Sequence, residues 1–228
     1  MDSFPEQREM SKDDYVIILG DFGIWRDSPQ QRWYLNWLEE RNFTTLFIDG
    51  NHENYDILDS YPVEESHGGK VHFIKPSVIH LMRGQVFDID DLKFFTFGGA
   101  ASHDISDGVL EIDDPRVKEW RDDPDKMYRI NHISWWEREM PNQKEMNEGI
   151  KNLAEHNDKV DFILTHCTAS STAALLSHGL YKPDKLTNYL EEIKCNVDYK
   201  RWLCGHYHDN KAITIKDIVL YEQIVRIA

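Results

Sequence analysis

Short runs of apolar residues alternate along the chain with longer stretches whose apolar positions follow a helical spacing. Tyr15–Leu19 is a continuous apolar run that ends in Gly20-Asp21, which predicts a buried strand leading into a loop. The β-branched run Thr44–Ile48 predicts a second strand of the same kind. Strands that alternate with helices are typical of α/β proteins, so we expect this class.

Further strands are expected in the middle and near the end of the chain. Four runs between residues 71 and 97 have the spacing of antiparallel neighbours in a sheet, and the last two runs resemble a closing hairpin. The expected ranges are 71–74, 78–81, 86–89, 93–97, 160–164, 201–204, 212–215 and 218–221.

Helix starts are marked by capping residues. Ser28 followed by Pro29 predicts a helix, because serine caps the first turn and proline suits its first position. In this helix Trp33, Trp37 and Leu38 fall on one face, which we interpret as a core-facing stripe.

Two more pairs have the spacing of a capping box, Ser134 with Glu137 and Asn142 with Glu145. A further helix is expected over 185–194. Residues 103–140 are irregular and rich in Asp and Pro, and they predict a loop-rich excursion over the surface. No linker or repeat divides the chain, so we expect a single domain over 1–228.

Charge narrows the range of partners. The 228 residues include 41 acidic and 26 basic ones, a formal net charge of −15, which weighs against nucleic-acid binding. A small phosphate-ester substrate stays compatible, because bound cations invert the local field. The three cysteines form no close pair, which favours a reducing, cytoplasmic location. No apolar run is long enough for a membrane helix, so no membrane partner is expected.

Four of the predicted strands end in side chains that can bind a metal ion. Strand ends of this kind meet in open α/β folds, so the four loops can converge. Carboxylate, amide and imidazole groups suit Mn, Fe or Zn. Each motif alone is common in turns or structural histidines, but the four together in this order are specific. The side chains are Asp21, Asn51, His52, His166, His206 and His208.

This order resembles the calcineurin-like metallophosphoesterase family, whose pattern is D-x-H, G-D, G-N-H-[DE], H and G-H-x-H. The last four motifs are present, and the resemblance spans roughly residues 15–220. It implies a four-layer αββα sandwich, in which two mixed β-sheets pack face to face with helices outside. The matching segments are Gly20-Asp21, Gly50-Asn51-His52-Glu53, His166 and Gly205-His206-Tyr207-His208.

The resemblance also implies roles for the metal-capable residues. Asp21 would bridge two divalent metals, and Asn51, His166 and His206 would complete one of the two sites. His208 would serve the other site. The family uses such a pair of cations, commonly Mn or Fe/Zn, to activate a hydroxide that attacks a phosphate mono- or diester.

Two neighbouring residues have roles outside the metal shell in this comparison. His52 corresponds to the family histidine that contacts the phosphate and protonates the leaving group. Glu53 is expected to orient its surroundings.

The first family motif is missing, because no Asp-x-His occurs in the sequence. The site that contains Asp21, Asn51, His166 and His206 keeps all its ligands, whereas the other keeps only Asp21 and His208, which predicts a weakened second metal. The strand that carries this motif is also expected to be missing. Its loss would leave sheet edges unpaired, which favours a rearranged edge, aggregation or a homo-oligomer. Either an internal methionine start or natural loss would explain this.

Three functions are therefore compared. The leading hypothesis is a metal-dependent hydrolase of phosphate mono- or diesters. The alternative is a catalytically impaired or inert family member that retains one metal site and acts as a binding or regulatory module. A nuclease is disfavoured by the net charge. A nucleophilic Cys167 is also disfavoured, because its neighbour His166 is assigned to the metal.

Overall fold

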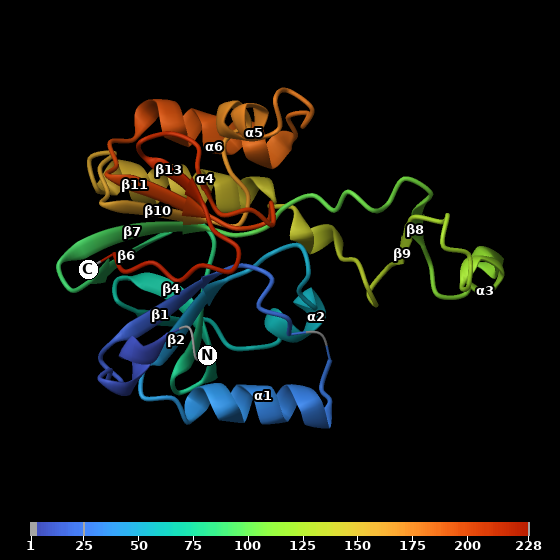
Figure 1. Cartoon of the computed structure of the whole chain (residues 1–228), viewed down its shortest axis with the longest axis horizontal. Helices are drawn as coiled ribbons and strands as arrows, with labels where there is room; N and C mark the ends of the chain where they lie inside the picture. Colours follow the sequence, from blue (N-terminus) through green and yellow to red (C-terminus); the bar gives the residue numbers. More distant parts are fainter. Residues whose placement is uncertain (1–3, 25, 228) are drawn as a thin grey trace.

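Two β-sheets packed face to face form the centre of the protein, and helices cover their outer faces. The computed structural model describes residues 4–24 and 26–227. In Figure 1 the layers follow one another as α4, α5 and α6, then one sheet, then the other sheet, then α1. Two mixed sheets with flanking helices confirm the predicted four-layer αββα fold.

The first sheet has five strands in the order β1-β2-β5-β4-β3. The neighbours β1/β2 and β2/β5 are parallel, whereas β4/β5 and β3/β4 are antiparallel. The bounds are β1 Tyr15–Leu19, β2 Thr44–Ile48, β3 Glu64–Ser66, β4 Gly69–Lys75 and β5 Val78–Leu81.

The second sheet has six strands in the order β12-β13-β11-β10-β7-β6. Its centre is parallel, and antiparallel hairpins close both ends. The four strands predicted between residues 71 and 97 were expected in one sheet. They instead form two antiparallel pairs, β4/β5 and β6/β7, that lie in different sheets. The bounds are β6 Gln85–Ile89, β7 Leu92–Phe97, β10 Phe162–Thr165, β11 Arg201–Cys204, β12 Lys211–Ala212 and β13 Asp217–Val219.

Alternating side chains of β2 show how the core is built. Leu46 and Ile48 point into the cluster between the sheets, where they join residues of the second sheet such as Leu164 and Leu203. Phe47 points the other way, into the cluster beneath α1. A strand buried on both faces is rich in apolar and β-branched residues, and all five residues of β2 are buried, including Thr44 and Thr45. All five residues of β1, at the edge of the sheet, are only half-buried.

The helices begin largely where capping residues predict. Ser28 accepts a hydrogen bond from the Gln31 N–H, and Asn142 with Glu145 forms a complete capping box. The helices are α1 Pro29–Glu39, α2 Tyr55–Leu58, α3 Pro115–Trp120, α4 Gln143–Glu155, α5 Ser170–Leu176 and α6 Lys185–Asn196, with 3-10 helices η1 Pro5–Arg8 and η2 Glu137–Glu139.

Two helix predictions were wrong. Trp33 is 66% exposed, because α1 packs chiefly through Leu35 and Leu38 while Trp33 stacks on Trp37. Ser134 caps no helix; its hydroxyl instead accepts a hydrogen bond from the Ile130 N–H at 2.9 Å. A local side-chain-to-backbone bond, between residues four apart, therefore replaces the expected helix cap.

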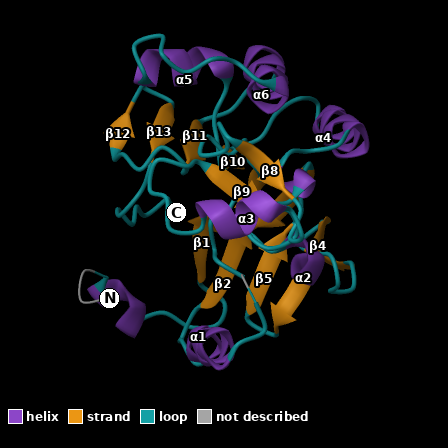
Figure 2. Cartoon of the chain, turned by 90° about the vertical axis from the view of Figure 1, so that its right-hand side faces the viewer, coloured by secondary structure: helices purple, strands orange, loops and turns teal. Residues whose placement is uncertain are grey.

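The excursion after residue 103 forms an arm with structure of its own. The arm contains α3 and a two-stranded parallel sheet of β8 (Gly108–Leu110) and β9 (Tyr128–Ile130). It projects away from the sandwich in Figure 1 and faces the viewer in Figure 2. Within the described residues, no helix combines the length and apolarity required to cross a lipid bilayer.

Candidate active site

Four loops converge at the carboxyl ends of strands from both sheets. Asp21 follows β1 and Asn51 follows β2, while His166 follows β10 and His206 follows β11. Because β1 pairs with β2 and β10 pairs with β11, each sheet contributes two adjacent loops. The predicted convergence of strand ends thus has a direct structural basis.

Glycines let these loops approach closely. A β-carbon at Gly50 would lie 2.1 Å from Oδ1 of Asp21, and one at Gly20 would lie 2.0 Å from Nδ1 of His166. Gly20 also has a φ of +92°, a conformation that costs glycine little. A larger residue at Gly50 would therefore displace Asp21, and one at Gly20 would displace the His166 ring.

The position of the proton on His166 follows from its contacts. Nδ1 lies 2.7 Å from the carbonyl oxygen of Leu19, which can only accept, so Nδ1 carries a proton. Nε2 faces the other way, 3.2 Å from Oδ1 of Asp21 and 3.2 Å from Oδ1 of Asn51. In the neutral ring Nε2 therefore presents a lone pair toward two oxygen acceptors.

The orientation of the Asn51 amide is fixed by a chain of donors. The buried Glu139 carboxylate accepts from the backbone N–H and the hydroxyl of Ser102, at 2.8 and 2.7 Å. The Ser102 oxygen therefore receives, at 3.3 Å, the hydrogen bond that the Asn51 NH₂ donates. This leaves the Asn51 carbonyl oxygen directed at His166. Sequence reasoning missed Ser102 and Glu139, since neither belongs to a recognisable motif.

These contacts bring three acceptor atoms together at one point. Burial tends to raise the pKa of Asp21, but its contacts with His166 and His52 hold that pKa well below the usual range. A carboxylate, an amide oxygen and an imidazole lone pair so close together need a positive charge between them. Either a second proton on His166 or a divalent cation supplies it, and N/O donors of this kind fit such a cation.

His206 lies beside this group. Its ring centroid is 5.0 Å from that of His166 and 5.6 Å from that of His103. Burial and the neighbouring His166 lower the pKa of His206 to about 3. The ring is therefore neutral at ordinary pH, which is the form that binds metals.

His208 has a different environment. It is exposed, and its ring stacks on Tyr221 with centroids 4.7 Å apart. Within the described part of the chain, the structure thus brings together Asp21, Asn51 and His166, with His206 beside them, but shows no contact between His208 and this group. No cluster of three or more His, Cys, Asp or Glu side chains with metal-binding geometry occurs among these described residues.

His52 and Glu53 lie next to Asn51 and act on different neighbours. The backbone N–H of His52 donates to Oδ1 of Asp21 at 3.1 Å, and burial lowers the pKa of its half-buried ring. Glu53 is fully buried and accepts hydrogen bonds from the N–H groups of Phe22, Gly23 and Ile24 at 2.6, 3.1 and 3.1 Å. Glu53 therefore shapes the loop that follows Asp21.

A second buried polar network lies close to the site, and no motif predicted it. The carboxylate of Asp49 accepts from Nε of Arg83 at 2.7 Å and from the Tyr55 hydroxyl at 2.9 Å, and its other oxygen lies 3.2 Å from Nε2 of His80. Arg83 also donates to the Glu139 carbonyl oxygen. Burial opposes ionisation of Asp49, but Arg83 and His80 keep its pKa well below the usual range.

Cys167 is not poised as a nucleophile, because burial raises the pKa of its thiol well above the usual value.

The sequence profile described as calcineurin-like phosphoesterase matches residues 2–210, a range that includes all six of the candidate site residues. A search of curated proteins finds no matching relative.

Proposed function

The chain belongs to the calcineurin-like phosphoesterase family, and from this premise we propose that it hydrolyses phosphate mono- or diesters with a divalent cation. Asp21, Asn51, His166 and His206 would hold this cation. The observation that carries the proposal is the convergence of two oxygens on Nε2 of His166, each at 3.2 Å. Members of the family are typically phosphoester hydrolases.

The residues present supply donors suited to Mn, Fe or Zn. When bound, such a cation acts as a Lewis acid toward phosphate oxygens and lowers the pKa of water. The low pKa of Asp21 keeps its carboxylate ionised, the form that would donate lone pairs to the cation. The Leu19 carbonyl fixes the His166 tautomer that leaves Nε2 available.

His52 is the proposed general acid. Burial lowers the pKa of its ring, so a minor fraction of the ring is protonated near pH 7, and this imidazolium is the form that can give up a proton. Its backbone bond to Asp21 keeps it beside the proposed cation site. In this role it would donate a hydrogen bond to the phosphate and then a proton to the departing oxygen.

A family member without turnover is the second candidate. The orientation of His208 favours it, since this residue stacks on Tyr221 rather than contacting Asp21. With a single cation, the chain would bind phosphate compounds as a regulatory module. Tight manganese binding without hydrolysis of any phosphate ester would select this candidate.

The primary test compares two aspartates on the same loop. With manganese, wild-type protein should hydrolyse p-nitrophenyl phosphate or bis(p-nitrophenyl) phosphate, and Asp21→Asn should lower kcat/KM at least ~100-fold. Asp27→Asn is the matched control, because Asp27 is exposed and pairs with Arg32. Unchanged turnover in Asp21→Asn would show that this assignment is wrong.

The role of His52 is tested through the leaving group. His52→Gln should lower kcat by roughly 100-fold for phenyl phosphate, whose leaving group needs a proton. The loss should be much smaller for p-nitrophenyl phosphate, because nitrophenolate leaves without one. Equal losses with both esters would mean that His52 contributes binding rather than proton transfer.

A further inference from the structure

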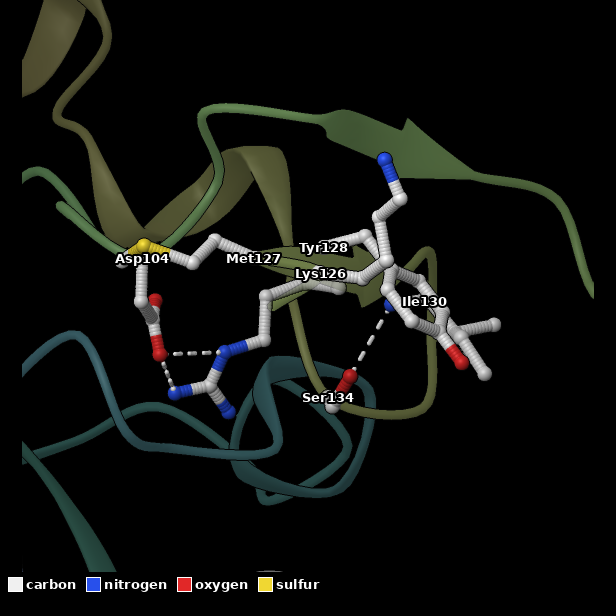
Figure 3. A pocket seen from close by; sticks show the side chains of 7 residues that line it. Asp104, Lys126, Met127, Tyr128, Ile130 and Ser134 are labelled. Carbon is white, nitrogen blue, oxygen red and sulfur yellow. Dashed lines mark hydrogen bonds and ion pairs between the residues drawn. The ribbon is translucent and has the colours of Figure 1, made fainter. Parts of the chain in front are cut away.

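A hollow next to the proposed catalytic site carries basic groups that the site itself does not use. Its volume is about 440 Å³, enough for a small organic group. Figure 3 shows the lining side chains, which come from Asp104, from β9 and the two residues before it, and from Ser134 in the turn that follows. The lining residues are Asp104, Lys126, Met127, Tyr128, Arg129, Ile130 and Ser134.

The hollow lies beside the metal-capable residues. Asp104 directly follows His103, whose ring centroid is 5.6 Å from that of His206. The carboxylate of Asp104 in turn accepts hydrogen bonds from Nε and Nη2 of Arg129. Arg129 lowers the pKa of His52 and Asp104 raises it, which agrees with a position of both charges near His52.

The guanidinium of Arg129 keeps donors available for a ligand. Both of its bonds go to one oxygen of Asp104, the Nε bond at 2.9 Å. Nη1 makes no hydrogen bond with any of the described residues, and the side chain is 22% exposed. Lys126 adds a second cation, held 4.8 Å above the Trp120 ring and 3.4 Å from Asp107. Arginine donors in a partly closed site suit carboxylate or phosphate oxygens.

We propose that this hollow is a subsite for a second anionic group of the substrate, carried on the leaving-group side of the scissile phosphate. The substrate class is a small organic phosphate that bears a further carboxylate or phosphate. Met127, Tyr128 and Ile130 would contact the apolar part between the two anions. This inference rests on the proposed function, because it places the first phosphate at Asp21 and His166.

Binding of non-hydrolysable ligands tests the subsite without requiring turnover. Calorimetry would compare 4-phosphonobenzoate with phenylphosphonate, which share the phosphonate and differ in the second anion. With manganese present, wild-type protein should bind 4-phosphonobenzoate about tenfold more tightly, the value of one charge-assisted contact. The ratio cancels any effect of a variant on the shared phosphonate.

Variants on the arm assign this preference to its residues. Arg129→Gln should reduce the ratio to about one, and Arg129→Lys should retain part of it because the charge is kept. Arg116→Gln is the matched control, since this exposed arginine on the same arm pairs with Asp114 and should leave the ratio unchanged. Circular dichroism and melting temperature confirm that each variant is folded.

Each outcome decides the proposal. Equal binding of the two phosphonates by wild-type protein, no binding of either, or an unchanged ratio in Arg129→Gln would overturn the subsite. A tenfold preference that Arg129→Gln abolishes would support it. If that preference occurs without hydrolysis of any phosphate ester, the subsite stands and the proposed hydrolase activity does not.

Discussion

Asp49 and Asp21 follow neighbouring strands, and each has an oxygen 3.2 Å from Nε2 of a histidine. Their other contacts differ. Asp49 is neutralised by Arg83, whose Nη2 lies 2.5 Å from its carboxylate, and it also accepts a hydrogen bond from the Tyr55 hydroxyl. Within the described residues Asp21 has no Lys or Arg in contact, and its carboxylate instead contacts Nε2 of His166 and the backbone N–H of His52.

This difference separates a structural acid, Asp49, from Asp21, the acid that we propose binds a cation. A buried carboxylate needs a compensating positive charge, and at Asp49 the chain supplies it from Arg83. At Asp21 the compensating charge has to come from a proton or from a cation taken from solution. The comparison therefore predicts that changes around Asp49 alter stability, whereas changes around Asp21 alter metal affinity.

The largest expected effect is loss of stability at Arg83. Arg83→Met should lower the free energy of unfolding by about 3–5 kcal/mol, because it leaves Asp49 buried without its cation. Arg116→Met, at the exposed pair with Asp114, should change it by less than about 1 kcal/mol. Urea unfolding measures both. If Arg83→Met lowered the free energy of unfolding by less than about 1 kcal/mol, Asp49 would not depend on Arg83 as its compensating charge, which would contradict the comparison.

The next effect is a pH dependence from His72, which contacts His80 at 3.1 Å. Burial and the neighbouring His80 lower the pKa of His72 to about 4 from its ordinary 6.5. As pH falls from 6.5 to 4, His72 is protonated in the unfolded chain but stays neutral in the folded protein. The free energy of unfolding therefore decreases by up to about 3 kcal/mol. His72→Asn removes the titrating ring and should flatten the plot of unfolding free energy against pH between pH 6.5 and 4. An unaltered slope would show that His72 titrates normally.

The smallest expected effect is at Ser102, which orients the Asn51 amide. Ser102→Ala should weaken manganese binding about tenfold by releasing that orientation. Ser60→Ala removes an exposed hydroxyl that donates to the Ile57 carbonyl and serves as the control. Calorimetric titration with manganese measures both variants, and equal affinities would mean that the Asn51 carbonyl is held by other contacts.

Local patterns predicted the positions of most strands well. The runs Tyr15–Leu19 and Thr44–Ile48 coincide with β1 and β2, because β-branched and aromatic residues favour strands and a glycine follows each run within two residues. The expected burial of the first run was wrong, since all five residues of β1 are only half-buried. The structure then brings Asp21, Asn51 and His166 together, as the motif order indicated.

Partners far apart in sequence could not be predicted. Arg83 bonds to Asp49 across 34 positions and Ser102 bonds to Glu139 across 37, without any motif that links them. The sequence spacing of β4, β5, β6 and β7 also could not show that the β4/β5 and β6/β7 hairpins belong to different sheets. His206 and His208 share one motif but have different surroundings, since local backbone turns rather than residue type direct them.

The central claim is that Asp21, Asn51 and His166 form a site for a divalent cation. Calorimetric titration of manganese into wild-type protein and Asp21→Asn at neutral pH tests it most directly, with Asp27→Asn as the control. We expect at least one cation per wild-type chain, with affinity about 100-fold weaker in Asp21→Asn and unchanged in Asp27→Asn. Manganese binding that is no tighter in wild type than in Asp21→Asn would contradict the account.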